Sequence, residues 1–298
     1  MKDIFGSKID LSKINKKNIK IDVGCDATAT NAAYWLKRDE DCFVIVIEPE
    51  PSNILELKNG LKKRRALTKG NYSLNLNRNE ILEEGQVVAN YDPERLLFIP
   101  VAIDNVGNKT EKRKFFCFTG NMSACSSLHP PTTNFKAKNY IEQNSQAYEI
   151  NVDCCSLEYI LDQLELGEDF YISMLKTDCQ ENDVEVLKSL GKYIHNVGVI
   201  RSEIYTNDSY VNSKTVQENV DNIYKFLEPA NFHGVFMTES DIVMANLNYD
   251  TVREDFHKYR NLVESGTIQS EIRKFFNTEI KRSFDGALNA EMQSELGQ

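Results

Sequence analysis

The chain has 298 residues, of which 41% are hydrophobic and 27% charged, and its net charge at pH 7 is -10; this composition is ordinary for a globular protein. Its longest basic run is Lys62–Arg65, which argues against nucleic acid as the main partner, because that binding depends on neutralising many phosphates. No hydrophobic run approaches the roughly 20 residues that cross a bilayer, so we expect no membrane span.

The cysteines and the N-terminus indicate a cytoplasmic protein. The seven cysteines contain no C-x-x-C pair, and the adjacent Cys154 and Cys155 cannot form an ordinary disulfide with each other. We interpret the seven as reduced thiols. The four histidines lack metal-ligand spacing, so no metal site is expected. Residues 1–18 form a polar lead-in without the hydrophobic segment of a secretory signal.

The first predicted elements alternate between strand and helix. Ile19–Val23 is a short β-branched run that ends at Gly24, and Asn31–Arg38 is predicted as a helix. Phe43–Ile47 is a continuous hydrophobic strand, and Pro51–Lys63 has the pattern of a helix. This order predicts the opening of a parallel α/β sheet, in which ligands bind at the carboxyl ends of the strands.

The middle of the chain is less regular. Asn71–Asp92 shows no clear element, and Leu96–Ala102 is predicted as the third strand, with a bulge at Pro100. Arg113–Thr119 has the pattern of another strand. Gly120–Asn139 is predicted as a long loop of the kind that often forms a functional lid.

The second half continues the alternation and ends in an antiparallel pair. Thr215 and Glu218 have the spacing of a capping box. From residue 250 the pattern is helical and charged, so we divide the chain into a domain of residues 1–249 and a C-terminal helical extension of residues 250–298. The predicted strands are Tyr148–Val152, Phe170–Leu175, Val197–Ile204, Phe232–Met237 and Ile242–Leu247, and the predicted helices are Ser156–Leu164, Asp183–Leu190 and Thr215–Leu227.

Three residues at the ends of the first two strands predict a cofactor site. Gly24 permits a tight turn because it has no Cβ, and Glu48 stands where a doubly wound sheet places a carboxylate that binds ribose hydroxyls. An NAD site needs further glycines around a pyrophosphate, whereas Asp22 would repel phosphate and attract an ammonium group. A ligand with a ribose and an ammonium but no phosphate fits better, and S-adenosyl-L-methionine is such a ligand.

The same stretch resembles the first motif of class I methyltransferases, acidic-x-Gly-x-x-x-Gly. Asp22 and Gly24 match this motif, and Thr28 stands in place of its second glycine. The resemblance implies a site for S-adenosyl-L-methionine, and we expect Cys25, Thr28 and Pro49 to contribute to it.

A second group of polar residues follows the fourth core strand. Lys176 and Asp178 lie two residues apart and would project to the same side of a strand, where they could position a hydroxyl and take its proton. A surface ion pair of little value is the alternative. Glu203 could share this role or only orient the cofactor loop, and His129 could act as a base or simply be exposed. Asp178 and Asp183 give only weak support for a divalent metal.

The run Leu175–Lys188 is similar to the Lys-x-Asp-x-x-Gly-x-Glu run of the FkbM family of methyltransferases. Lys176 and Asp178 match, Glu181 replaces the glycine and Asp183 replaces the glutamate. The resemblance covers about residues 19–248. Further pieces follow in the family's order: Glu48-Pro49, Val101-Ala102-Ile103-Asp104, Ser126-Ser127-Leu128, Ser156-Leu157, Glu203 and Asn246.

This resemblance implies a class I methyltransferase fold, a Rossmann-like doubly wound sheet that is mostly parallel and ends in an antiparallel hairpin. It also implies S-adenosyl-L-methionine as cofactor and, most often, methylation of a hydroxyl on a small molecule or glycan. Asp22, Gly24 and Glu48 would hold the cofactor with Asp104 near its adenine, while Lys176, Asp178 and Glu203 would face the acceptor. Two alternatives remain open: a catalytically inactive Rossmann-like binding or assembly module, and a nicotinamide-dependent oxidoreductase.

Overall fold

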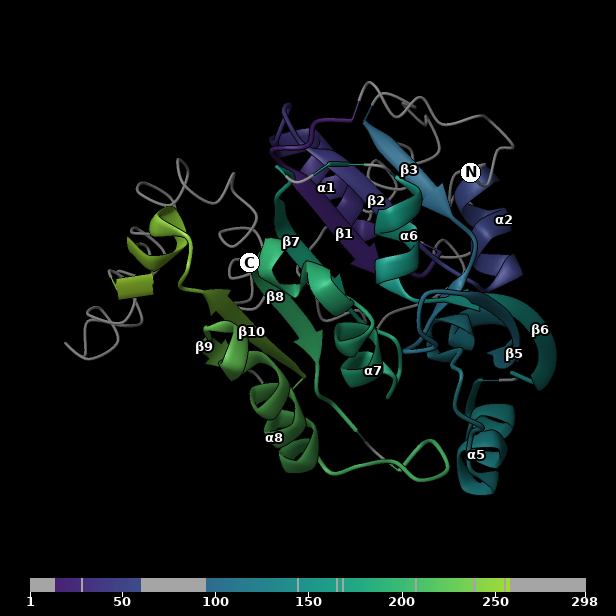
Figure 1. Ribbon diagram of the computed structural model, residues 1–298. Coiled ribbons are helices and arrows are strands. Elements are labelled where there is room, and N and C mark those ends of the chain that lie inside the picture. Colours follow the sequence, from purple (N-terminus) through teal and green to yellow (C-terminus); the bar gives the residue numbers. More distant parts are fainter. Residues whose placement is uncertain are drawn as a thin grey trace.

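The computed structural model describes residues 14–27, 29–59, 95–143, 145–164, 166–167, 169–206, 208–237, 240–254 and 256–257. Its centre is a seven-stranded sheet in the order β3-β2-β1-β7-β8-β10-β9 (Figure 1). The strands are β1 (Ile19–Val23), β2 (Phe43–Ile47), β3 (Leu96–Ile99), β7 (Ile172–Thr177), β8 (Val197–Glu203), β9 (Phe232–Met237) and β10 (Asp241–Asn246).

The direction of the strands defines one edge where a ligand can bind. Strands β3, β2, β1, β7 and β8 pair in parallel, and β10 is antiparallel to both β8 and β9. The chain continues outward from β1 through β2 to β3 and then returns to add β7 on the other side of β1. The carboxyl ends of β1 and β7 therefore form the point where the strand order reverses, which is the usual ligand site of such sheets.

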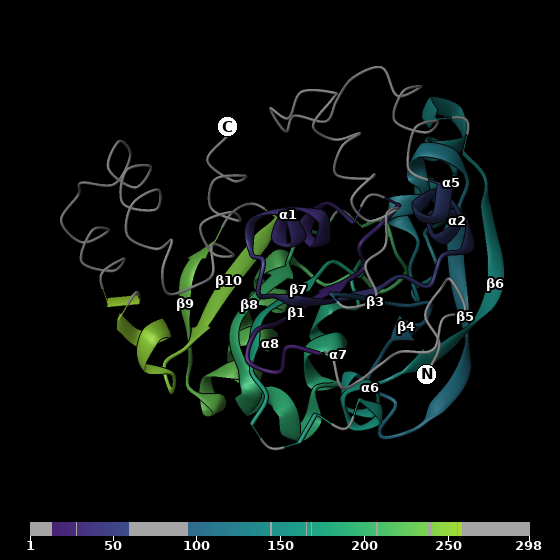
Figure 2. The same ribbon diagram turned by 90° about the horizontal axis from the view of Figure 1, so that it is seen from above.

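Helices cover both faces of this sheet, which explains why its parallel strands are hydrophobic on both sides. Ile45 and Ile47 of β2 pack with the helices of one face, and Val44 and Val46 pack with those of the other. Figure 2 shows α1 (Thr30–Arg38) on one side of the sheet and α6 (Leu157–Gln163), α7 (Asp183–Lys188) and α8 (Val216–Leu227) on the other. Helix α2 (Pro51–Asn59) follows β2. The mostly parallel sheet confirms the predicted mixed α/β class and is consistent with a Rossmann-like fold.

A smaller sheet in the order β4-β6-β5 lies beyond the carboxyl ends of β1 and β3 (Figure 1). It consists of β4 (Ala102–Ile103), β5 (Thr110–Phe118) and β6 (Ala147–Cys155). The prediction of one strand over Leu96–Ala102 is therefore wrong. The chain leaves the main sheet at Pro100, which has no N–H for a ladder, and β4 then pairs with β6.

The segment predicted as a long loop contains two helical elements, so that prediction is also wrong in part. They are the 3-10 helix η2 (Gly120–Cys125) and the α-helix α5 (Thr133–Gln143). The hydroxyl of Thr132 accepts a hydrogen bond from the N–H of Phe135 at 3.2 Å, which satisfies a donor at the start of α5. Pro130 and Pro131 are typical of a loop, so the sequence did not indicate that a helix begins directly after Thr132.

Most other elements agree with the predicted pattern. Ser156 caps α6 by accepting from the N–H of Tyr159, and Thr215 and Glu218 form the capping box that begins α8. The terminal antiparallel pair is present as β9 and β10. Two short 3-10 helices, η3 (Gly191–Asn196) and η4 (Glu228–Ala230), complete the connections. Residues 250–254 are helical; the predicted end of α2 at Lys63, residues 71–92 and the remainder of the C-terminal extension lie outside the described residues.

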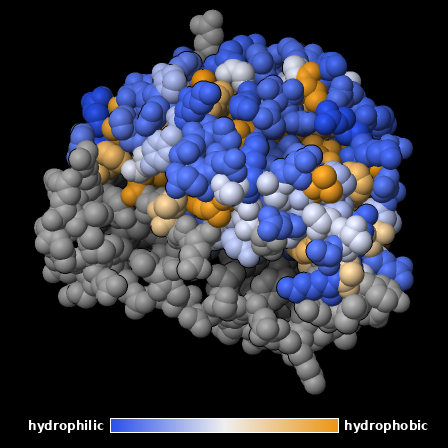
Figure 3. Space-filling model, turned by 90° about the horizontal axis from the view of Figure 1, so that it is seen from below, coloured by the Kyte–Doolittle hydropathy of each residue, from blue (hydrophilic) through white to orange (hydrophobic). Residues whose placement is uncertain are grey.

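The surface of the described residues is mainly hydrophilic on the face that Figure 3 displays, where hydrophobic residues are scattered between polar ones. Among the described helices, none has the length and hydrophobicity that a membrane crossing requires.

Candidate functional site

A cavity of about 170 Å³ lies at the carboxyl ends of β1, β2 and β7. Gly24 and Asp26 follow β1, Glu48 and Pro49 follow β2, and the turn after β7 adds further residues. Segments from the smaller sheet and from η2 complete the wall. The lining residues are Val23, Gly24, Asp26, Ile47, Glu48, Pro49, Asn53, Val101, Ala102, Ile103, Phe115, Ser123, Ala124, Cys125, Ser126, Leu128, Asp178, Cys179, Gln180 and Asn182.

Gly24 joins the ends of three strands. Its N–H donates to the carbonyl of Ile47 at 3.0 Å, and the N–H of Asp178 donates to the carbonyl of Val23 at 3.0 Å. Gly24 has φ +73°, and a Cβ at this position would lie 1.9 Å from the carbonyl oxygen of Asp178. The glycine is therefore required by its backbone conformation and by the close approach of the turn that follows β7.

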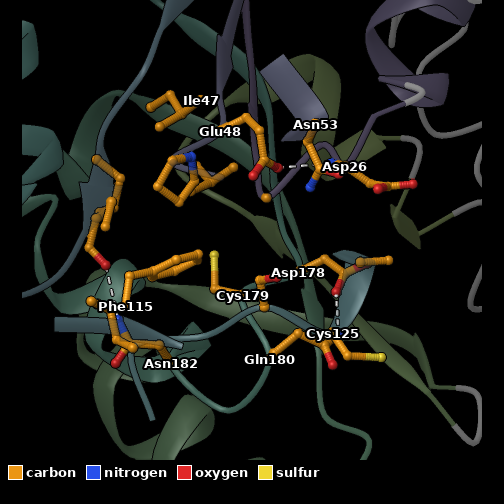
Figure 4. A pocket seen from close by; sticks show the side chains of 18 of the residues that line it. Asp26, Ile47, Glu48, Asn53, Phe115, Cys125, Asp178, Cys179, Gln180 and Asn182 are labelled. Atoms are coloured by element: carbon orange, nitrogen blue, oxygen red, sulfur yellow. Dashed lines mark hydrogen bonds between the residues drawn. The ribbon is translucent and has the colours of Figure 1, made fainter. Parts of the chain in front are cut away.

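Glu48 is the acidic residue at the end of β2, and its carboxylate is held by backbone donors. One oxygen accepts from the N–H of Asp26 at 3.0 Å and the other from the N–H of Glu50 at 2.9 Å. Burial raises the pKa of Glu48 to about 8, with a smaller contribution from the charge of Asp26. Figure 4 shows Glu48 and Asp26 together at one side of the cavity. A carboxylate oxygen can accept more than one hydrogen bond, so Glu48 retains capacity for ligand hydroxyls.

Asp22 and Lys176 form a buried ion pair beside the cavity rather than in its wall. They are register partners on β1 and β7, and the Lys176 ammonium lies 3.6 Å from an Asp22 oxygen. The same ammonium lies 3.3 Å from Asp178 and donates to the carbonyl of Gly24 at 3.3 Å. Burial alone would lower the pKa of Lys176, but the charges of Asp178 and Asp22 outweigh it and raise the pKa. The cation predicted near Asp22 is thus, in this structure, a lysine of the protein itself.

Asp178 and Glu203 lie together at the ends of β7 and β8. The amide of Gln180 donates to Asp178 at 3.0 Å and to Glu203 at 3.1 Å. Burial alone would raise the pKa of Asp178, but Lys176 and hydrogen bonds from Glu203 and Gln180 hold it below its ordinary value. Burial, followed by the charges of Asp178 and Asp183, raises the pKa of Glu203 well above its ordinary value. The side chain of Asp178 is 39% exposed and lines the cavity, whereas Glu203 stands behind it.

Of the other predicted cofactor residues, one lines the cavity and two do not. Pro49 lines the cavity, but Cys25 is buried against α1 and does not. Asp104 follows the lining residue Ile103 and pairs with Arg113 at 3.1 Å instead of facing the cavity. Thr28 lies outside the described residues.

His129 lies just behind the cavity wall. Its Nε2 lies 3.2 Å from the Oδ1 of Asn182, whose own amide nitrogen donates to the carbonyl of Ile103 at 2.9 Å. Because Asn182 Oδ1 is an acceptor in this arrangement, Nε2 carries the proton. Burial lowers the pKa of His129. The structure therefore gives His129 a fixed orientation through Asn182, which lines the cavity.

Several lining residues were not predicted from the sequence. Asn53 accepts a hydrogen bond from Ser123 at 2.6 Å, which connects the start of α2 to η2 across the cavity. Phe115 comes from β5, and Gln180 comes from the run Leu175–Lys188 that resembles the FkbM pattern. Asn53 and Phe115 carry no sequence signal for this position, because only the tertiary fold brings α2 and β5 to the cavity.

The charge of the cavity limits the ligands that fit it. Among its described lining residues, Asp26, Glu48 and Asp178 carry carboxyl groups and none carries a basic group. Figure 4 shows these side chains on opposite sides of one space. Like charges at short range disfavour a pyrophosphate here, whereas a cationic ligand with hydroxyl groups is favoured. Ile103, Phe115 and Leu128 add hydrophobic surface for a flat ring.

The chain matches a known protein family over most of its length. The family described as methyltransferase FkbM domain matches residues 15–233. No curated protein and no solved structure matches the chain. The matched span is more than half of the chain and includes both strand-end groups that form the cavity.

Proposed function

The chain belongs to the FkbM methyltransferase domain family, and on this basis we propose that it transfers a methyl group from S-adenosyl-L-methionine to a hydroxyl of a small molecule or glycan. The observation that carries this proposal is the cavity at the carboxyl ends of β1, β2 and β7, with Glu48 in its wall. The strand order and the helices on both faces support a doubly wound, class I methyltransferase arrangement.

The residues present fit this cofactor. The Glu48 carboxylate is available to two ribose hydroxyls, and the lining residues Pro49 and Ile103 provide hydrophobic surface for adenine. Asp26 and Asp178 give the cavity the negative charge that a sulfonium and an ammonium group require. When bound, the cofactor supplies an electrophilic methyl group on a positively charged sulfur.

The chain's own residues would then orient and deprotonate the acceptor. Asp178 is the ionised, partly exposed carboxylate in the wall, so it is the group that we assign to accept a hydroxyl proton. Lys176 holds Asp178 through their 3.3 Å contact and balances Asp22. Because methyl transfer from a sulfonium needs little base strength, orientation of the hydroxyl supplies much of the rate.

Three further predictions remain part of this proposal. Residues 1–249 form the methyltransferase domain, and residues 250–298 form a helical extension. The pattern of unpaired cysteines supports a cytoplasmic location. We propose that Asp22, Cys25 and Asp104 contribute to the cofactor site from behind its wall, and that Thr28, which lies outside the described residues, contributes to it as well.

Calorimetric titrations with S-adenosylhomocysteine and with NAD test the proposal against its two alternatives. We expect S-adenosylhomocysteine to bind and NAD not to bind, since a pyrophosphate would enter a cavity that is lined by Asp26 and Asp178 and by no basic residue among the described ones. An inactive binding module predicts that neither ligand binds, and an oxidoreductase predicts binding of NAD. Transfer of labelled methyl groups to a panel of hydroxylated sugars and metabolites would then identify the acceptor.

A further inference from the structure

One amide group connects the two carboxyl groups at the ends of β7 and β8. Gln180 Nε2 lies 3.0 Å from Asp178 Oδ1 and 3.1 Å from Glu203 Oε2. An amide nitrogen has two hydrogens, so it can donate to both carboxyl groups at once. Gln180 therefore fixes the position of each carboxyl group relative to the other.

Tyr210 supports the orientation of this amide. Its hydroxyl has one hydrogen, which is shared between the carbonyl of Cys125, the closer acceptor, and Gln180 Oε1 at 3.3 Å. Because the two carboxyl groups accept hydrogen bonds, the amide nitrogen faces them, and the amide oxygen then lies on the side of the Tyr210 hydroxyl. The ring of Tyr210 packs against Phe135, with 5.7 Å between the ring centroids, and the residue is 4% exposed.

The backbone of Gln180 is held in an unfavourable conformation. Gln180 has φ +52° and Glu181 has φ +78°, and both values lie in the left-handed region. Ser127 donates to the carbonyl of Gln180 at 2.7 Å and so holds the turn from the side of the cavity wall. A left-handed backbone conformation costs free energy at a residue other than glycine, so it persists only where the surrounding contacts offset that cost. At Gln180 these contacts include the hydrogen bonds of its side-chain amide and of its carbonyl.

Charged and titratable groups surround the carboxyl pair on every side. Lys176 and Asp22 face it from β7 and β1, Asp183 from α7, and Asp241 paired with Arg201 from β10 and β8. The thiols of Cys125 and Cys179 and the hydroxyl of Tyr210 complete the surroundings. Burial first, and then the charge of Asp178, raises the pKa of Asp183. Two adjacent carboxyl groups, of which only Asp178 has a contact with Lys176, at 3.3 Å, among the described residues, favour retention of one proton.

We propose that Gln180 and Tyr210 are positioning residues that hold Asp178 and Glu203 as a carboxyl pair with one shared proton, so that Asp178 faces the cavity as the ionised member. The role of this pair in catalysis rests on the proposed methyl transfer. A proton that leaves the acceptor hydroxyl moves to Asp178, so the pair then holds two protons and returns one to solvent after the product leaves. Neither positioning residue needs to touch the acceptor.

The pair can be observed directly by carboxyl carbon NMR of protein with labelled aspartate and glutamate. Asp178→Asn and Glu203→Gln assign the two signals by their disappearance. In the wild type we expect two separate titration steps, one below and one above the ordinary carboxyl range. Gln180→Met keeps the length of the side chain but removes the amide, and we expect the lower step to rise by about one pH unit, since one hydrogen bond to a charged group is lost.

Tyr210→Phe provides a second, gentler variant that keeps the ring packing. We expect it to move the lower step in the same direction but by less, because the amide can then rotate. Tyr193→Phe is the matched control, since the Tyr193 hydroxyl donates to Asp162 at 2.6 Å away from the cavity, and it should leave both steps unchanged. Coincident carboxyl titrations in the wild type, or unchanged steps in both test variants, would overturn the proposal. Binding of S-adenosylhomocysteine is measured separately, so failure of the proposed function would not hide either result.

Discussion

Gly24 and Asp178 meet through their backbones at the carboxyl edge of the sheet. A Cβ on Gly24 would lie 1.9 Å from the carbonyl oxygen of Asp178, and Gly24 itself has φ +73°. The loop after β1 and the turn after β7 are thus packed together without space for a side chain. This contact fixes the distance between Glu48, which lies beside the first loop, and Asp178, which begins the second.

Gly24→Ala should destabilise the protein by about 3 kcal/mol or more, because it adds a steric clash to the cost of a left-handed alanine. Gly107→Ala is the matched control. Gly107 has φ +72°, but among the described residues no atom beyond its chain neighbours lies within 4 Å of the place that a Cβ would take. This variant should therefore lose only about 1–2 kcal/mol. Urea unfolding measures both, and equal losses would show that the close approach to Asp178 costs nothing.

Glu181→Gly should stabilise the backbone at the turn after β7. Glu181 has φ +78°, at the position where the FkbM resemblance places a glycine. Glu181→Ala removes the same carboxylate but keeps a Cβ, so the comparison of the two variants isolates the backbone contribution. We expect the glycine variant to exceed the alanine variant in free energy of unfolding by about 1–2 kcal/mol. A more stable alanine variant would contradict this conformational explanation.

Lys176→Met should destabilise the protein by about 3–5 kcal/mol, because it leaves the buried Asp22 carboxylate without its counter-charge. Asp22 is fully buried, and the Lys176 side chain is 8% exposed. In an Asp22→Asn background the same substitution should cost less, since the two residues are coupled. The four variants of this cycle are compared by urea unfolding. An equal cost of Lys176→Met in both backgrounds would mean that the ion pair has no structural role.

Affinity for S-adenosylhomocysteine should fall as the pH is lowered through about 8. Burial raises the pKa of Glu48 to about 8, so below this pH the carboxyl group is protonated. It must lose that proton before it can accept hydrogen bonds from the ribose hydroxyls as a carboxylate. The loss of affinity approaches about tenfold per pH unit for one linked proton. Calorimetry from pH 6 to pH 9 measures it, and Glu48→Gln separates this effect from titration of the ligand's own amino group. An equal slope in the variant would exclude Glu48 as the source.

The core of the fold was predictable because its strands are short, continuous runs of hydrophobic residues. Phe43–Ile47 is hydrophobic at every position and is buried on both faces of the sheet, so periodicity and burial agree. The path after Ile99 was not predictable, because Pro100 is equally compatible with a bulge and with a change of sheet. The helix after Thr132 was not predicted for two reasons. Two prolines precede it, and its own sequence is mostly polar, without a clear hydrophobic face.

The part of the site that lies at the ends of the predicted strands was predictable. Gly24, Glu48 and Asp178 follow strands that were identified, and all three line the cavity. The partners of these residues depend on strand order. Asp22 faces Lys176 because β7 pairs with β1, and Tyr210 reaches Gln180 through a loop that no local pattern places there.

Calorimetric titration of the wild-type protein with S-adenosylhomocysteine at pH 8.5, beside Glu48→Gln, is the decisive experiment for the cofactor site. Glu149→Gln is the control, because Glu149 is an exposed carboxylate on β6 paired with Lys114 at 3.0 Å. We predict binding to the wild type and the control, and at least about tenfold weaker binding to Glu48→Gln, since hydrogen bonds to a charged group are lost. Absence of binding to the wild type, or equal binding to all three proteins, would contradict the assignment of the cavity as the cofactor site.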